Sequence, residues 1–383
     1  MFTMIISVFF LLAMTAEETS AADDDRLNSW IDFCASDGSK ALYAKPFEPV
    51  LSMDLMAERR MGHGEETTAK KVLDDRGQFW RTKHRNLQAD ARTKSMVLNK
   101  RKKSIKVMLY GDSITEYWSY EVNKVALMES FGRDVDNERE IFVNGISGDE
   151  TSHGLYRIHH GAFPTATVND IVLLIGTNDL GRAFRSAFKR SSEKVPECLS
   201  EEMVRAIRDE TPKVVQGILS IVEDMRLMSP NSRIVVLGIL PRGFRNPKAW
   251  KTVSQQSMPD METSENLPTR EVLESRAFMG QFSQPNVFSK AIDFINDAVK
   301  RGIEVAKVGG SRVYYKECND VFLNEDDGNM KFEIIKDALH PDKPRGYEVF
   351  GKCIKEHLDQ LPENWEFKNV RVRDREEQIG EAV

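Results

Sequence analysis

Short apolar segments alternate with longer amphipathic segments through the central part of the chain. The short segments are rich in β-branched residues, and most are followed by glycine or turn residues, which is typical of strands buried in a parallel sheet. Five such strands are predicted, at residues 105–110, 141–144, 171–175, 234–240 and 312–315.

The segments between these strands carry apolar residues three and four positions apart, which is the spacing of an amphipathic helix. Helices are predicted at residues 120–131, 214–228, 288–308 and 347–358. Strands that alternate with crossover helices predict one doubly wound α/β domain, which we place at residues 74–362.

The regions that flank the predicted sheet are less regular. A loose helical pattern at residues 74–99 leads into four basic residues, 100–103, which we interpret as a solvated loop because no aromatic residue is interleaved with them. Residues 23–73 mix charges with little periodicity and form an N-terminal extension. The charged tail, residues 363–383, fits either an appended strand or a disordered segment.

Two polar connections, residues 181–209 and 244–285, are longer than the loops that doubly wound domains normally use. Both follow the carboxyl ends of predicted strands, the side on which open α/β sheets bind ligands. They are therefore predicted to be insertions that cover or shape a pocket, although surface loops without that role would have the same composition.

The N-terminus carries an apolar segment, residues 2–16, which is shorter than the roughly 20 residues that span a bilayer. Small residues at 20–22 precede three aspartates, as in a signal-peptide cleavage region. Residues 1–22 are thus predicted to be a signal peptide, and the protein to be secreted or to lie in the lumen of the secretory pathway. An uncleaved anchor and a buried N-terminal helix remain alternatives, because no Lys or Arg precedes the segment.

Composition narrows the range of functions. The chain has 54 basic and 60 acidic residues, a formal charge of −6, and so lacks the positive field that attracts nucleic acid. The mean hydropathy of −0.44 argues against several membrane spans. The composition therefore indicates a globular protein and disfavours a primary role in nucleic-acid binding and a multi-span membrane protein.

Four cysteines, Cys34, Cys198, Cys318 and Cys353, lie too far apart in the sequence for a metal site of paired cysteines. In an oxidising compartment they could form two disulfides, with three possible pairings. Four buried free thiols are equally compatible with the sequence.

Candidate chemistry begins where the first predicted strand ends, at Gly111-Asp112-Ser113-Ile114-Thr115. A serine at a strand-to-helix turn presents its hydroxyl and its N–H at the helix N-terminus, where developing negative charge is favoured. Ser113 is therefore a candidate nucleophile, although a helix cap would explain the same residues.

Three further residue groups follow predicted strands or lie near the C-terminus. Gly148 offers an N–H without side-chain cover, and the Asn178 amide offers a second neutral donor, the kind of group that stabilises an oxyanion as it forms. Asp337 precedes His340 by three residues, close enough to hold the imidazole toward a serine.

In this order and spacing, the four groups resemble the SGNH hydrolase superfamily of GDSL-type esterases and lipases. The resemblance covers residues 104–358, with Ile114 where the name-giving leucine would stand. Residues 147–161 and 235–243 look closest to the catalytic subunits of platelet-activating-factor acetylhydrolases. The fold implied is a flavodoxin-like three-layer α/β/α sandwich with a five-stranded parallel sheet.

The resemblance also implies roles for individual residues. Ser113 would be the nucleophile, His340 the general base and then acid, and Asp337 the carboxylate that orients it. The N–H groups of Ser113 and Gly148 and the side chain of Asn178 would form the oxyanion hole. The reaction implied is hydrolysis of short-acyl esters, most often acetyl esters of a polysaccharide or lipid, through an acyl-enzyme and without a metal or organic cofactor.

Two other functions fit parts of the pattern. A catalytically idle binding module could use the same fold, and a lipid esterase of the phospholipase or lysophospholipase type could use the same triad. A nucleotide-binding domain is disfavoured because GDSIT lacks the glycines of a phosphate loop. The related branch includes dimers, so a dimer is possible here.

The remaining conspicuous polar residues have ordinary interpretations. His153, His159 and His160 lack carboxylates at metal-ligand spacing and are predicted to be surface or capping residues. Asp179 is predicted to bond loop amides beside Asn178. Arg242 could face the pocket or form a salt bridge.

Overall fold

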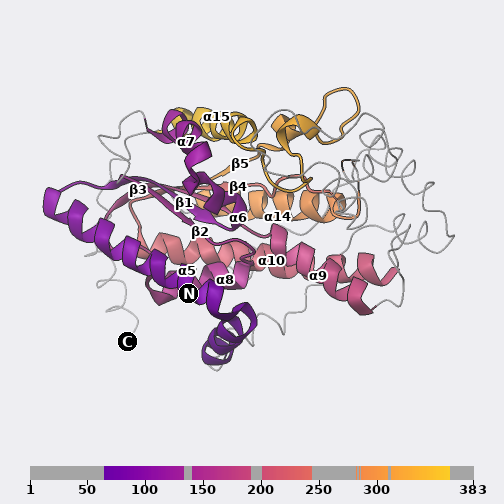
Figure 1. Cartoon of the computed structure of the whole chain (residues 1–383), viewed down its shortest axis with the longest axis horizontal. Coiled ribbons are helices and arrows are strands. Elements are labelled where there is room, and N and C mark those ends of the chain that lie inside the picture. Colours follow the sequence, from indigo (N-terminus) through magenta and orange to yellow (C-terminus); the bar gives the residue numbers. More distant parts are fainter. Residues whose placement is uncertain are drawn as a thin grey trace, which may run out of the picture.

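The computed structural model contains one five-stranded, fully parallel sheet in the order β2-β1-β3-β4-β5 (Figure 1). It describes residues 64–132, 140–190, 201–243, 286–308 and 312–362, together with Phe282 and Gln284. The strands are β1 (Ile105–Gly111), β2 (Ile141–Gly145), β3 (Val168–Leu174), β4 (Arg233–Leu237) and β5 (Val313–Lys316). This is the strand order of flavodoxin-like folds, so the predicted fold class is confirmed.

The central strand β1 is buried on both faces. Met108 and Tyr110 belong to the apolar core on one side of the sheet, and Val107 and Leu109 belong to the core on the other side. Alternate residues of a strand point to opposite faces, so a strand covered on both sides must be apolar almost throughout. This explains why the strand appears in the sequence as a continuous apolar run.

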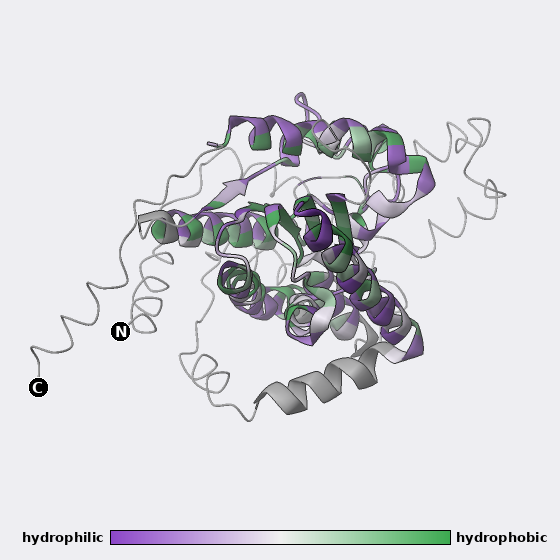
Figure 2. Cartoon of the chain, turned by 90° about the vertical axis from the view of Figure 1, so that its left-hand side faces the viewer, coloured by the Kyte–Doolittle hydropathy of each residue, from purple (hydrophilic) through white to green (hydrophobic). Residues whose placement is uncertain are grey.

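Helices cover both faces of the sheet. On one face lie α7 (Lys124–Phe131) and α15 (Arg345–Gln360), and on the other lie α8 (Thr151–Arg157), α10 (Glu201–Met228) and α14 (Ser289–Val308) (Figure 1). Hydrophobic and hydrophilic residues alternate along these helices in Figure 2, as expected for helices that bury one side. The three layers agree with the predicted sandwich.

Several shorter or irregular segments complete the fold. The predicted helix at residues 120–131 begins as a separate 3-10 turn, and only its second part, α7, is α-helical. The other elements are α6 (Ser113–Glu116), η1 (Tyr117–Ser119), η2 (Glu121–Asn123), the π-turn η4 (Ile158–Ala162), α9 (Thr177–Arg190), η5 (Asn319–Phe322) and η6 (Phe332–Ile334).

An N-terminal helix, α5 (Gly64–Arg101), precedes the sheet and is kinked at Gly77, whose φ of 67° is in the left-handed region. Its second part lies against α8 and η4 (Figure 1). Trp80 and Leu98 on this part are buried. The helix predicted loosely at residues 74–99 is thus an integral layer of the domain.

The predicted insertion at residues 181–209 is helical at both of the ends that the structure describes. The helix α9 continues to Arg190, and α10 already begins at Glu201. Phe184 and Met203 are buried in the main core, so these ends belong to the helical layer. Of the second predicted insertion, residues 244–285, only Phe282 and Gln284 are described, and its proposed role lies outside the described residues.

A disulfide joins Cys318 to Cys353, one of the cysteine pairs that the sequence left open. The other two cysteines, the predicted signal peptide, residues 23–63 and the tail 363–383 lie outside the described residues. Within the described ranges, no helix combines the length and apolar character needed to cross a membrane.

Candidate active site

The candidate nucleophile lies at the carboxyl end of the central strand. Ser113 is the first residue of α6, and its side chain is buried in a turn that begins directly after β1. The Asp112 carboxylate accepts the N–H of Ile114 at 2.9 Å and so caps this short helix. The capping role weighed against a catalytic one therefore belongs to Asp112, and the serine hydroxyl is left for other contacts.

The structure brings the three predicted triad residues together across 227 positions of sequence. The Oγ of Ser113 lies 2.9 Å from Nε2 of His340, and Nδ1 of His340 lies 2.7 Å from Oδ2 of Asp337. The second oxygen of Asp337 accepts the backbone N–H of His340 at 2.7 Å. The imidazole is therefore held by its ring and by its own backbone, with the free nitrogen directed at the serine.

Contacts between separate elements fix the position of the histidine loop. The Tyr347 hydroxyl of α15 donates to the Ile114 carbonyl at 2.9 Å, which ties this helix to α6. Ala338 has a φ of 55°, unusual for a residue with a side chain, and its carbonyl accepts the N–H of Gly243 at 2.7 Å. The loop is thus held directly by the segment that follows β4, and the helix α15 that comes after it is tied to α6.

Two of the three predicted oxyanion donors, Gly148 and Asn178, follow β2 and β3 in the chain. Gly148 has a φ of 79°, a conformation that favours glycine. The Asn178 amide nitrogen lies at the start of α9 and donates to the Asp149 carbonyl at 3.0 Å and to the Asp112 carboxylate at 3.2 Å. Asn178 therefore connects the glycine loop to the serine loop at one edge of the sheet.

Two buried ionisable residues, Asp112 and Arg242, lie near the candidate site. Burial raises the pKa of Asp112 to about 7, against the opposing effect of the hydrogen bond from the Ile114 N–H. Burial lowers the pKa of Arg242 to about 10. The Arg242 guanidinium lies 4.4 Å from the Phe288 ring and donates to the Thr177 hydroxyl at 3.1 Å, so it supports the turn that carries Asn178.

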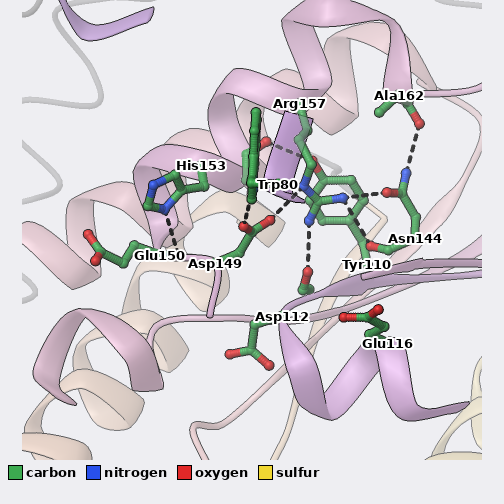
Figure 3. A network of polar contacts seen from close by, with 12 residues as sticks. Trp80, Tyr110, Asp112, Glu116, Asn144, Asp149, Glu150, His153, Arg157 and Ala162 are labelled. Carbon is green, nitrogen blue, oxygen red and sulfur yellow. Dashed lines mark hydrogen bonds and ion pairs between the residues drawn. The ribbon is translucent and has the colours of Figure 1, made fainter. Parts of the chain in front are cut away.

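Asp149, the residue after Gly148, is the centre of a buried network (Figure 3). Its side chain pairs with Nε of Arg157 at 2.8 Å and accepts the indole N–H of Trp80 at 2.7 Å. Arg157 also donates to the Gly111 carbonyl at 2.7 Å and to the side chain of Asn144. Sequence reasoning missed this network, although an aspartate directly after a candidate oxyanion glycine was a usable signal.

The ordinary interpretations of the other polar residues hold where they can be checked. Asp179 accepts the N–H and the hydroxyl of Thr151, the latter at 2.7 Å, which confirms a structural role. His153 is buried and accepts the Glu150 N–H at 2.9 Å as a cap, while His159 pairs with Asp224. Among the described residues, no group of three or more potential ligands could hold a metal ion.

A model of the GDSL-like lipase/acylhydrolase family matches residues 109–257. The matched range contains Ser113, Gly148 and Asn178, three of the residues that carry the resemblance. Over these residues the chain is similar to GDSL-like lipases and acylhydrolases, in agreement with the resemblance found in the sequence.

The chain is also similar to individual curated proteins and to solved structures. The human platelet-activating factor acetylhydrolase IB subunit alpha1 is 27% identical over 199 residues, which are 50% of this chain and 66% of that protein. The rat subunit alpha2 is 28% identical over 173 residues, 43% of this chain and 59% of that protein. A solved structure, the acetyl xylan esterase AlAXEase, matches with a TM-score of 0.39 at 14% identity, covering 67% of this chain and all of that chain. The matches therefore span less than two thirds of these curated relatives.

Proposed function

We propose that the protein is a serine hydrolase that cleaves short-acyl esters, with acetyl esters of a carbohydrate or lipid as its substrates. The observation that carries the proposal is a chain of two contacts. Ser113 Oγ lies 2.9 Å from His340 Nε2, and His340 Nδ1 lies 2.7 Å from the Asp337 carboxylate. A nucleophile, a base and an orienting carboxylate at these distances are the parts that acyl transfer to a serine requires.

In the proposed reaction, His340 removes the Ser113 hydroxyl proton while Oγ attacks the ester carbonyl carbon. The tetrahedral intermediate collapses, the alcohol leaves with the proton that His340 returns to it, and an acyl-serine remains. Water, deprotonated by the same imidazole, then attacks the acyl-serine, and the acid is released as His340 returns the proton to Ser113 Oγ. Asp337 remains ionised and stabilises the imidazolium each time His340 takes up a proton.

Negative charge forms on the former carbonyl oxygen, and the N–H groups of Ser113 and Gly148 and the Asn178 amide are the proposed donors to it. Asn178 has two N–H bonds, and its longer contact, at 3.2 Å to Asp112, is the one that the substrate oxygen would replace. The contact to the Asp149 carbonyl would keep the amide oriented. Neutral donors suit this task because they bring no charge that must be desolvated.

The preference for a short acyl group is supported by the curated relatives, whose name is that of an acetylhydrolase. An ester series separates this proposal from its alternatives. Hydrolysis of p-nitrophenyl esters from acetate to palmitate is measured for the protein and for Ser113→Ala. We expect a maximum at acetate and no activity in the variant.

A maximum at long chains would instead indicate a lipid esterase. A folded wild type that is inactive on every ester, and that a fluorophosphonate fails to label at Ser113, would leave a catalytically idle binding module. The labelling is read by the mass of the peptide that carries Ser113, so it does not depend on finding the right substrate.

We also infer secretion, with residues 1–22 removed as a signal peptide. The disulfide between Cys318 and Cys353 supports an oxidising compartment, because cytosolic thiols are normally kept reduced. N-terminal sequencing of protein exported by a eukaryotic host tests this inference. Export with Met1 retained would contradict it.

A further inference from the structure

The helix α5 lies outside the range that the family model matches, yet it contacts the loop that carries Gly148. We propose that Trp80 and Lys83 on this helix are positioning residues that hold the Gly148 N–H in the oxyanion hole. The proposal rests on the proposed function, and it assigns to the N-terminal helix a part in catalysis.

One contact fixes the residue after Gly148. Trp80 is 1% exposed, and its indole N–H donates to one carboxylate oxygen of Asp149 at 2.7 Å, while Arg157 pairs with the other oxygen (Figure 3). The ring of Trp80 is itself held, stacked on His84 with centroids 5.1 Å apart and met edge-on by Tyr156. The carboxylate therefore has a fixed donor on each of its oxygens, one of which comes from α5.

A second contact fixes the residue before Gly148. The Glu116 carboxylate accepts the backbone N–H and the hydroxyl of Ser147, both at 2.6 Å. Lys83 of α5 donates to the other oxygen of Glu116 at 2.6 Å. Burial would raise the pKa of Glu116, but the hydrogen bonds from Lys83 and Ser147 outweigh it and lower the pKa below its usual value. The carboxylate is thus held in the ionised form that accepts these bonds.

The contacts from Trp80 and from Lys83 both affect the orientation of the Gly148 N–H. The Gly148 N–H lies in the plane of the peptide that joins Ser147 to Gly148, and its direction is fixed when the residues on both sides are held. Both neighbours of Gly148 are held through α5. The Asp149 carbonyl also accepts from Asn178, so the same loop links the two proposed oxyanion donors. An oxyanion hole contributes to the rate only when its donors are already in place, and a small displacement of one donor lowers turnover without affecting the fold.

The test compares Trp80→Phe, which keeps an aromatic ring and removes the N–H, with Leu98→Val, which trims a buried side chain on the same helix far along from the loop. For p-nitrophenyl acetate we expect kcat of Trp80→Phe to fall about 10- to 100-fold with KM within about twofold. Leu98→Val should keep kcat, with both variants checked for folding by circular dichroism.

Lys83→Met provides a second variant if Trp80→Phe does not fold, because the Lys83 side chain is 38% exposed and the change keeps its apolar stem. We expect its kcat to fall about 3- to 10-fold. Thr82→Ala, an exposed neighbour on the same helix, is its matched control. The pH at which kcat/KM rises should stay unchanged in both test variants, since neither touches His340.

Three results would overturn the inference: wild-type kcat in both test variants, a rise in KM with kcat intact, or an equal loss in Leu98→Val. These results are distinct from failure of the proposed function, in which the wild type itself neither hydrolyses the ester series nor takes up the fluorophosphonate.

Discussion

Removal of the Cys318–Cys353 disulfide is predicted to destabilise the protein strongly while leaving its chemistry intact. The cross-link spans 35 residues, and the loop that it closes includes η5, η6, Asp337 and His340. Both half-cystines are buried, and Cys353 lies within α15. The change to test is Cys318→Ala/Cys353→Ala, together with each single substitution.

The expected magnitude follows from the loop length. Opening a closed loop of 35 residues returns about 13 cal/mol/K of chain entropy to the unfolded state, or about 4 kcal/mol at 25 °C. Most domains have a free energy of unfolding of about 5 to 15 kcal/mol, so this loss is a substantial part of the total. Turnover per folded molecule should change less than about twofold, because the contacts of Ser113, Asp337 and His340 do not involve either sulfur.

Urea unfolding followed by tryptophan fluorescence measures the free energy of unfolding, and alkylation of the urea-unfolded, unreduced chain shows by mass which cysteines are bonded. The double variant and each single variant should lose the same amount, because any one substitution opens the same loop. A loss below about 1 kcal/mol in a protein whose cross-link is proven by mass would refute the entropy argument. Alkylation of both cysteines in the unreduced wild type would refute the cross-link itself.

Four further outcomes are expected. Asn178→Ala should lower kcat on p-nitrophenyl acetate about 10²- to 10³-fold in a folded protein, and near wild-type turnover would exclude it from the oxyanion hole. Asp337→Asn should lower kcat about 10⁴-fold by favouring the wrong tautomer of the catalytic imidazole, which steady-state kinetics at pH 8 would show, and a loss below tenfold would contradict this. Burial raises the pKa of Asp179 to about 8, so the folded protein keeps a proton that the unfolded chain releases, and stability contributed by this group is present at acid pH and is lost as the pH rises toward 8. Asp179→Asn should therefore gain more in urea-unfolding free energy at pH 9 than at pH 5, and an equal effect at both would contradict the shift. A Cβ at Gly145 would lie 2.4 Å from the Glu116 backbone nitrogen and 2.6 Å from a backbone oxygen, so Gly145→Ala should lose at least about 1 to 3 kcal/mol of stability, and an unchanged urea midpoint would contradict the close approach.

The sheet could be predicted from the sequence because strands covered on both faces are apolar almost throughout. All five predicted strands are present, and the differences lie at their ends. β3 begins at Val168, three residues before the predicted start at residue 171. The prediction started late because the polar residues Asn169 and Asp170 interrupt the apolar pattern. Asp170 is tolerated there since Arg233 on the adjacent strand pairs with it at 2.5 and 2.8 Å. Such a cross-strand ion pair cannot be read from one strand alone.

The predicted catalytic residues come together for a topological reason, since the carboxyl ends of parallel strands meet at one edge and the loops there carry Ser113, Gly148 and Asn178. The supporting layer was not predicted. Trp80 was interpreted only as part of a loose helix, because its partner, Asp149, lies 69 residues away. The bond between Cys318 and Cys353 likewise could not be predicted, because it depends on the packing of α15 against the segment that follows β5.

The geometry divides the candidate active site between two halves of the sheet. The proposed nucleophile and the proposed oxyanion donors follow β1, β2 and β3, whereas His340 and Asp337 follow β5, the strand at the other side of the sheet. The hydrogen bond from Tyr347 to the Ile114 carbonyl joins α15 to α6 directly beside Ser113. The 2.9 Å contact between Ser113 and His340 therefore depends on how α15 sits on α6, and a change that loosens this helix should reduce turnover before it unfolds the sheet. The contacts from α5 support the loop that carries Gly148, and the contact from α15 supports the approach of His340 to Ser113. Each half of the candidate site thus depends on a helix from a different end of the described chain.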